Sequence, residues 1–436
     1  MSKFDVIVAG GGIAGISAAE ILARNGLKVL IFDAEKKFCS KSSSQQHGWY
    51  HLGSLYSIFP DNHHLKAMLV SLEDLIKNYQ CFNGMNIQIN KNGELNFKKK
   101  KNGWINDERI KYIVASRNNK DFKNKKLKNI FNILNWEKQI KKFISRHERY
   151  EKHNWKNSRA SEFIPNANFL DYRKKFIKKP NIEGLKLNND THFMMEGYDR
   201  TMKSYNIIND LFSSFLKNKG KFKVDTKYLK SKKIQNNHEI HTNKGKFICK
   251  YFINATGYNL RKNNSNQFNV KSVFSPIAVF YPPLIDKSFV RLTPKKDKTI
   301  NHLLHTTENN KKYSVIGCGM DANKKNKKLV EKKLIDLCKL NFKNFKKENL
   351  VGIYSGLKTE YMKNKKKRHY GYKIFEKEKN HFLIIPGKFS LCFSLASELM
   401  KIIVGKDKLK LKKFKQSKKN KIISFPLHYN LISKKI

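Results

Sequence analysis

A glycine-rich turn near the N-terminus constrains the fold of this chain more than any other feature of its sequence. The β-branched run Phe4–Ala9 leads directly into Gly10, Gly12 and Gly15, which match the pattern GxGxxG. Glycine at the first position permits a tight turn, and at the second it lets the backbone approach a pyrophosphate. At the third it lets a helix pack closely on the sheet. We therefore expect a parallel β-α-β unit here.

The residues after this turn complete the unit in the required order. A helical stretch runs from Ile13 to Asn25, and a second strand, Lys28–Phe32, ends at Asp33. The helix start offers N–H groups and a positive dipole end to a phosphate, while Asp33 can accept hydrogen bonds from ribose hydroxyls. This order predicts a dinucleotide site, although the fingerprint by itself does not separate NAD from FAD. The predicted contact residues are Gly10, Gly12, Ile13, Ala14, Gly15, Asp33 and Ala34.

A serine-rich segment, Ser42–Tyr56, follows the second strand closely and contains glycines and histidines. On this segment the chain resembles the D-amino-acid-oxidase-like superfamily of FAD-dependent oxidoreductases, most nearly the branch of glycerol-3-phosphate dehydrogenase and L-2-hydroxyglutarate dehydrogenase. That branch has a serine-rich segment that runs into His-x-Gly and an aromatic residue, as this one does. The resemblance implies FAD, with the segment along its pyrophosphate and under its isoalloxazine. The residues assigned in this way are Ser42, Ser43, Ser44, His47 and Gly48.

Two later segments match the same family in the expected order. Phe252–Gly257 reads as a strand that ends in Ala-Thr-Gly, and Phe382–Lys388 as a strand and glycine turn before a helix at about 389–404. The resemblance implies that the start of this helix faces the pyrimidine edge of the flavin. It also places Val224 where relatives contact the adenine through a backbone amide and carbonyl. The residues added to the FAD site are Val224, Ala255, Thr256, Gly257, Gly387, Lys388 and Phe389.

The predicted fold class is α/β: a discontinuous, Rossmann-like FAD-binding domain with a second, mixed-sheet α+β domain that forms the substrate site or its cap. The FAD-binding domain is expected from residues 1–80, 200–260 and 350–405, and the substrate domain from 85–195 and 268–349. A helix is expected to begin at Asp199 and to feed the second part of the FAD-binding domain.

The charge balance is strongly basic, with 90 lysines and arginines against 35 aspartates and glutamates, a formal net charge of +55. The excess is nearly all lysine and is spread over the whole chain, which favours a compositional bias over attraction to a membrane surface or to nucleic acid. Lysine runs lack interleaved aromatic residues, so no specific nucleic-acid partner is expected. The basic C-terminal tail, residues 406–436, is expected to be a solvated extension. Its apolar patch at 422–427 leaves a membrane or partner arm as the alternative.

Expectations about compartment and metal content rest on the segments and spacings that the sequence lacks. No run of 18 uncharged apolar residues and no cleavable leader is found, and the six cysteines form no CxxC pair. We therefore expect cytoplasmic residence, with peripheral contact at the inner face of an anionic membrane left open. The histidine spacing suggests no metal site.

Residues that the resemblance places near the flavin supply the candidate chemistry. His51 falls on the family's His-x-Gly position, and an unperturbed pKa of about 6.5 suits proton removal near neutral pH. Its alternative role is structural, bonding the FAD backbone. Arg200 could pin a carboxylate or phosphate, or form an ion pair at a helix start, and Lys358 could contact substrate or flavin. The candidate catalytic residues are His51, His47, Tyr198, Arg200 and Lys358, with Glu196 as a further candidate base.

These observations predict an FAD-dependent oxidoreductase that transfers a hydride from a CH–OH group of a small anionic metabolite to flavin N5. A quinone or another acceptor would then reoxidise the flavin. Oxidation of a CH–NH group, as by amino-acid oxidases of this fold, is the alternative reaction, because fold alone does not choose between the two. A flavin-bearing protein whose basic surface binds RNA or a membrane is the alternative from another class.

Overall fold

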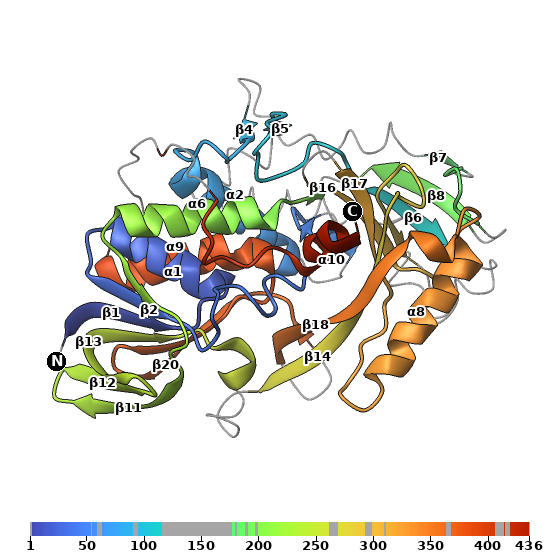
Figure 1. Ribbon diagram of the computed structural model, residues 1–436. Coiled ribbons are helices and arrows are strands. Elements are labelled where there is room, and N and C mark those ends of the chain that lie inside the picture. The colour runs from blue at the N-terminus through green and yellow to red at the C-terminus, as the bar shows by residue number, and fades with distance from the viewer. Residues whose placement is uncertain are drawn as a thin grey trace.

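The computed structural model shows two large β-sheets, with a layer of helices on the first (Figure 1). Most of the expected segment 85–195, namely residues 116–176, lies outside the residues that the structure describes. The described residues are 2–53, 55–58, 63–89, 95–115, 177–178, 181–187, 191–196, 199–260, 269–292, 299–308, 311–362, 368–405, 414 and 419–435.

The first sheet contains the predicted β-α-β unit. Strand β1 pairs in parallel with β2 and β13, β10 pairs in parallel with β2, and β21 pairs in parallel with β13. Strands β12 and β11 continue the sheet in antiparallel fashion, and β20 forms a hairpin with β21. The strands are β1 (Lys3–Ala9), β2 (Val29–Phe32), β10 (Lys221–Lys223), β11 (Tyr228–Ile234), β12 (Asn237–Thr242), β13 (Gly245–Asn254), β20 (Lys373–Glu378) and β21 (His381–Ile385).

Alternation along β1 explains how both faces of this sheet are covered. Val6 and Val8 pack with apolar residues of α1, α6 and α9, whereas Ile7 and Ala9 pack with residues of β12 and β13 such as Phe252. Figure 1 shows α6, α1 and α9 together over the sheet. The described α-helices are α1 (Ile13–Arg24), α2 (His63–Tyr79), α6 (Ser204–Lys217), α8 (Lys327–Asn341), α9 (Cys392–Val404) and α10 (Leu427–Lys435).

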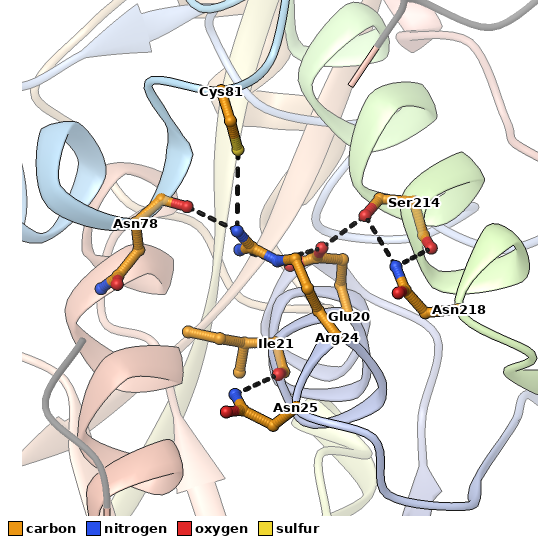
Figure 2. Close-up of polar contacts among 8 residues, drawn as sticks. All are labelled: Glu20, Ile21, Arg24, Asn25, Asn78, Cys81, Ser214 and Asn218. Carbon is orange, nitrogen blue, oxygen red and sulfur yellow. Dashed lines mark hydrogen bonds and ion pairs between the residues drawn. The ribbon is translucent and has the colours of Figure 1, made fainter. Parts of the chain in front are cut away.

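A buried ion pair joins the helices of this layer (Figure 2). Glu20 of α1 is fully buried, and its Oε1 lies 2.8 Å from Nε of Arg24. The hydroxyl of Ser214 in α6 donates to Glu20 at 2.6 Å, and Nη1 of Arg24 donates to the carbonyl of Asn78 in α2 at 2.6 Å. Because a buried charge is costly unless it is paired and hydrogen-bonded, these contacts fix how the three helices align.

The second sheet has nine strands in the order β19-β18-β14-β17-β16-β15-β6-β8-β7. Helix α8 packs against β14 and β18, and its apolar face joins a core that includes Phe280, Ile316 and Leu334. The strands are β6 (Lys111–Ala115), β7 (Ile177–Lys178), β8 (Thr191–Glu196), β14 (Val270–Phe280), β15 (Phe289–Leu292), β16 (His302–Glu308), β17 (Lys311–Gly317), β18 (Leu350–Met362) and β19 (Arg368–His369). The two sheets together confirm the predicted α/β fold.

Short elements bring loops to the space between the sheets. Two-stranded pairs form between β3 and β9 and between β4 and β5. The helix expected to begin at Asp199 begins at Ser204 instead, because Arg200 and Thr201 form strand β9. These elements are β3 (Trp49–Tyr50), β4 (Ile87–Ile89), β5 (Leu95–Phe97), β9 (Arg200–Thr201) and the 3₁₀ turns η1 (Leu55–Ile58), η5 (Gly257–Asn259), η6 (Lys347–Asn349) and η7 (Phe389–Leu391).

The C-terminal tail is packed onto the body over residues 419–435. Ile423 is 1% exposed and forms an isolated β-bridge with Phe38, and the ring of Phe425 stacks on Tyr205 with 3.9 Å between centroids. The expected solvated extension is therefore wrong for this segment, because its apolar patch has partner surfaces within the protein. Helix α10 packs against β18, and its Ile432 shares an apolar cluster with Tyr313 of β17 and Tyr354 of β18. Among the described helices, none is both long and apolar enough to cross a membrane.

Candidate active site

The glycine turn lies at the carboxyl ends of β1 and β13, where the backbone of Gly10 lies against that of Ala255. Gly10 has φ +106°, and a Cβ there would lie 2.5 Å from the carbonyl oxygen of Ala255. A Cβ on Gly15 would lie 1.9 Å from the carbonyl oxygen of Gly10, so a side chain fits at neither position. Gly12 differs, because its Cβ would meet only the Ser43 hydroxyl, at 3.3 Å. The chain thus leaves space at Gly12, as the approach of a pyrophosphate requires.

The serine-rich segment folds against the start of α1. Gly12, the N-cap residue of α1, has no side chain that could accept a hydrogen bond from the first turn. Ser43 takes this role, because its Oγ accepts from the N–H of Ile13 at 3.0 Å. The carbonyl of Ser44 accepts from the N–H of Leu427 at 2.8 Å, so the C-terminal segment supports this loop. The Ser43 hydroxyl therefore lies at the positive end of the helix dipole, where anions bind favourably. Two predicted site residues, Ser42 and Ala34, are exposed.

Asp33 ends β2, and its carboxylate is held by the backbone. Its two oxygens accept from the N–H of Gly11 at 2.6 Å and of Glu35 at 2.8 Å. Burial raises the pKa of Asp33, and these bonds offset part of that effect. The N–H of Asp33 donates to the carbonyl of Lys223 at 3.0 Å, which brings Val224 beside it. Each carboxylate oxygen can accept a further hydrogen bond, so the predicted role with ribose hydroxyls fits this geometry.

The Ala-Thr-Gly turn after β13 lies beside the glycine turn. The N–H of Ala255 donates to the carbonyl of Ala9 at 2.8 Å, which joins the ends of β13 and β1. Thr256 turns its hydroxyl back to Oδ1 of Asn254 at 2.7 Å, and Gly257 has φ +57°. The two signatures, about 240 residues apart in the sequence, therefore form one cradle.

The closing turn after β21 reaches the same region. Gly387 has φ +66°, and a Cβ there would lie 2.5 Å from the carbonyl oxygen of Gly371. Nζ of Lys388 lies 5.1 Å from the centroid of the Tyr370 ring. Phe389 begins the 3₁₀ turn that precedes α9, so the predicted closing helix starts as η7 and continues as an α-helix from Cys392.

Asp199, just before β9, is the central acceptor of a buried cluster that joins the β3–β9 pair to β6 of the second sheet. Its carboxylate accepts from the N–H of Leu52 at 2.7 Å, the hydroxyl of Tyr112 at 2.7 Å and the indole of Trp49 at 3.1 Å. Burial acts to raise the pKa of Asp199, but the contact with His51 and these bonds outweigh it and lower the pKa overall. Asp199 is therefore a carboxylate at neutral pH.

His51 faces this carboxylate with Nδ1, which lies 3.6 Å from Oδ2 of Asp199. This separation is longer than a hydrogen bond, so the contact is electrostatic. Burial lowers the pKa of His51, and Asp199 offsets only part of that effect. His51 is therefore a neutral imidazole near pH 7. The facing carboxylate favours the proton on Nδ1, which leaves the lone pair of Nε2 to accept another.

Trp49 connects His51 to two further histidines, because its ring lies 4.4 Å from that of His51 and 5.6 Å from that of His302. The rings of His47 and His302 are 4.4 Å apart, and burial lowers the pKa of His302 to about 3 and of His47 well below its ordinary value. A Cβ on Gly317 would lie 2.5 Å from Nε2 of His302, so this glycine makes room for both rings. The charge of Lys358 contributes to the lowered pKa of all three histidines, and burial lowers the pKa of Lys358 itself.

Arg200 is not part of this cluster, contrary to the prediction. Its Cζ lies 4.3 Å from the centroid of the Phe97 ring, and Nη1 donates to the carbonyl of Asp199 at 3.2 Å. On β9 it pairs opposite Tyr50, so strand alternation turns its side chain away from the face that Asp199 shares with Trp49. Arg200 also does not lie at the helix start where an ion pair was expected, because it belongs to β9 and α6 begins at Ser204. Tyr198 and the side chain of Glu196 lie outside the described residues.

Sequence reasoning missed Asp199 and His302 as members of the site. Asp199 was assigned to a helix start, and only its pairing with His51 across the β3–β9 strands could have indicated another role. His302 lies in the second sheet, 255 residues from the histidine that it touches, and no local motif marks it. The need for glycine at position 11 was also missed: a Cβ there would lie 1.8 Å from the Phe38 ring, so a side chain does not fit.

Solved structures of similar fold include several flavoenzymes. Dithionite-reduced L-alpha-glycerophosphate oxidase from Mycoplasma pneumoniae, with FAD bound, matches with a TM-score of 0.64 at 13% identity, over 95% of this chain and 98% of that one. Glycine oxidase from Geobacillus kaustophilus matches with a TM-score of 0.62 at 11% identity, over 96% and 99%. L-proline dehydrogenase from P. horikoshii matches with a TM-score of 0.58 at 13% identity, over 94% and 96%.

At such low identity these structures establish the fold but no substrate. No curated protein sequence matches the chain. The family model described as FAD dependent oxidoreductase matches residues 5–317, which include both fingerprints of the cradle and most of the histidine cluster. This match agrees with a cradle whose own packing leaves Gly12 open beside an anion-attracting helix start. The chain therefore belongs to the FAD-dependent oxidoreductase family, and its cofactor is FAD.

Proposed function

We propose that this enzyme oxidises the CH–OH group of a small anionic metabolite. The observation that carries the proposal is the grouping of three imidazoles about Trp49: its ring lies 4.4 Å from that of His51 and 5.6 Å from that of His302, which in turn contacts His47. Burial lowers the pKa of all three imidazoles, and the charges of Lys358 and Lys388 lower that of His47 and His51 further. Such a site offers a proton acceptor and positive charge together, which suits a hydroxyl group on an anion.

His51 is the proposed proton acceptor. When bound, FAD supplies the hydride acceptor of the reaction. The hydroxyl proton of the substrate passes to Nε2 of His51, and the imidazolium that results is stabilised by the buried carboxylate of Asp199 opposite Nδ1. A base placed in this way typically contributes about 10²–10⁴-fold to the rate.

The charges around the histidine cluster favour an anionic substrate over one that carries an ammonium group. Both Lys358 and Lys388 act on the imidazoles through their positive charge. Of the described carboxylates nearby, Asp199 is engaged by its three donors and His51, and Glu360 interacts with Lys358. A substrate ammonium would therefore meet like charge without a dedicated partner among the described residues.

Oxidation of a CH–NH group is the second candidate, because the structures of glycine oxidase and L-proline dehydrogenase share the fold. An amine substrate must reach the flavin as the neutral amine, and the two lysines favour that form by lowering its pKa. The two reactions therefore differ in charge preference: the first selects anionic hydroxy compounds, and the second accepts amino acids at high pH.

Anaerobic bleaching of the flavin tests this proposal. The oxidised holoenzyme is mixed with 2-hydroxy acids, polyol phosphates and amino acids, and the loss of flavin absorbance is followed in the absence of oxygen. Rapid bleaching by a hydroxy acid or polyol phosphate, with none by the matched uncharged polyol, supports the proposal. Bleaching by amino acids alone would replace it with the amine reaction. Addition of oxygen or a soluble quinone to the reduced enzyme then identifies the acceptor.

A further inference from the structure

A second cluster of histidines and a carboxylate lies outside the active site, in the first sheet. It consists of His238 on β12, Glu378 at the end of β20 and His381 at the start of β21. Strand β13 pairs with β12 through residues 245–249 and with β21 through residues 252–254. The cluster therefore lies at the junction where β21 replaces β12 as the neighbour of β13.

The three side chains converge on a common point. One nitrogen of each imidazole and one oxygen of the carboxylate lie within 4.8 Å of one another. Oε1 of Glu378 is 3.1 Å from Nδ1 of His381, with which it shares a hydrogen bond, and 3.8 Å from Nδ1 of His238. A tetrahedral Zn²⁺ ion with bonds of about 2.0–2.1 Å holds its ligand atoms roughly 3.3 Å apart, a value between these two distances.

A hydrogen bond fixes the tautomer of His238. Its Nε2 lies 3.0 Å from the carbonyl oxygen of Lys379, and because a carbonyl only accepts, Nε2 must carry a proton. In the neutral ring, Nδ1 then carries a lone pair, and that lone pair faces the carboxylate of Glu378. Two acceptors that face each other repel unless a cation lies between them or the ring takes a second proton.

The two imidazoles of the cluster are buried, whereas the carboxylate is partly exposed. The side chains of His238 and His381 are each 1% exposed. Nδ1 of His238 and Nε2 of His381 are buried and have no hydrogen-bond partner in the part of the chain that the structure describes. Metal-binding histidines commonly donate their second N–H to a backbone carbonyl, as His238 does to Lys379.

We propose that His238, Glu378 and His381 bind one divalent transition-metal ion, for which Zn²⁺ is the best chemical match. Two imidazoles and one carboxylate are ligands that Zn²⁺ accepts, and water can supply the fourth because the side chain of Glu378 is 35% exposed. The ion joins the β11–β12–β13 meander to the β20–β21 hairpin at their junction. Its role is structural, since β13 and β21 lead to the Ala-Thr-Gly turn and the closing turn of the FAD cradle.

The test uses the FAD-loaded enzyme after treatment with a chelator and removal of the chelator. Equilibrium dialysis against ZnCl₂, with metal analysis, measures the number of ions bound and their affinity. The wild type should bind one tight Zn²⁺, and Glu378→Gln and His381→Gln should each lower the affinity by about 100-fold or more. Zn²⁺ should also raise the Tm of the wild type by about 2–5 °C but not that of Glu378→Gln.

His241→Gln is the matched control, because His241 also lies on β12 beside a glutamate, Glu239, but outside the cluster. This variant should retain the tight Zn²⁺ of the wild type. Glu378 is partly exposed, so its variant should fold, and a normal flavin spectrum verifies this. The proposal is overturned if the wild type binds no tight Zn²⁺, or if Glu378→Gln binds it as well as His241→Gln does. The cluster would then be a hydrogen-bonded group in which His381 and Lys379 supply the partners of Glu378 and His238.

Discussion

The glycine cradle and the histidine cluster, which consists of His47, His51 and His302, are built in opposite ways. In the cradle, formed by Gly10–Gly15, Ala255–Gly257 and Gly387, backbone atoms of one segment press on those of another. In the histidine cluster, side chains from the loops beside β3 and before β9 meet side chains from β16 and β18 of the second sheet. The cradle has no room for side chains at most of its glycines, whereas the chemistry of the histidine cluster depends on the charges of its side chains. Substitutions should therefore change structure and cofactor content in the first region, and rate and pH dependence in the second.

The largest effects are expected within the cradle, where two glycines should fail differently. Gly10→Val should prevent stable folding, because its Cβ would lie 2.5 Å from a backbone oxygen at φ +106°. Gly12→Val should fold but lose its bound FAD, because only a hydroxyl limits the space there. Circular dichroism and the flavin-to-protein ratio measure the two outcomes. Tight FAD binding by Gly12→Val would contradict the proposed approach of the pyrophosphate.

His51→Ala should give the next largest effect, a reduction in the rate of anaerobic flavin reduction of about 10²–10⁴-fold with FAD retained. In the wild type the pKa of His51 lies below 6.5, so the base form predominates at neutral pH. The rate should therefore be level near pH 7–8 and fall as the pH drops through that lowered pKa. Stopped-flow traces from pH 5 to 9 should show this acidic limb in the wild type only. An unchanged rate and profile would return His51 to a structural role.

Asp199→Asn should lower the rate of reduction less, by between about 10- and 100-fold, through loss of the position and tautomer of His51. The carboxylate raises the pKa of His51, so its removal should move the acidic limb to lower pH. A loss of stability alone would not move this limb. The profile is measured with variant that retains a full complement of FAD. A limb at its wild-type position would show that Asp199 does not act on His51.

Lys388→Met should have the smallest effect, a change of less than about fivefold in the rate at pH 8. The ammonium group lowers the pKa of both His51 and His47, so its removal should move the acidic limb to higher pH, opposite to Asp199→Asn. Loss of the charge should also lower the flavin midpoint potential by on the order of 30 mV, as measured by dye-coupled titration. Shifts of the same sign in both variants would mean that the limb does not report on His51.

Whether a region could be predicted from sequence depended on how far apart in the chain its interacting residues lie. The segments around Gly10, Asp33 and Ala255 were located from sequence because each is a local pattern set by backbone sterics. Arg200 was misplaced because its strand forms only by pairing with Trp49–Tyr50, about 150 residues earlier. The tail was misjudged for a related reason: the patch at 422–427 resembles an anchor until the surfaces of Phe38 and Tyr205 that cover it are seen.

The sequence by itself determined the family, the cofactor and the segments that form the cradle. The cradle could be located because glycine is required wherever two backbones come too close for a Cβ. The tertiary structure alone decided which titratable groups meet. The contacts of Asp199 with His51, of His302 with His47, and of His238 with Glu378 join residues that lie 148, 255 and 140 positions apart. The chemical behaviour of these groups depends on burial and on distances between side chains, and no local sequence pattern predicts either quantity.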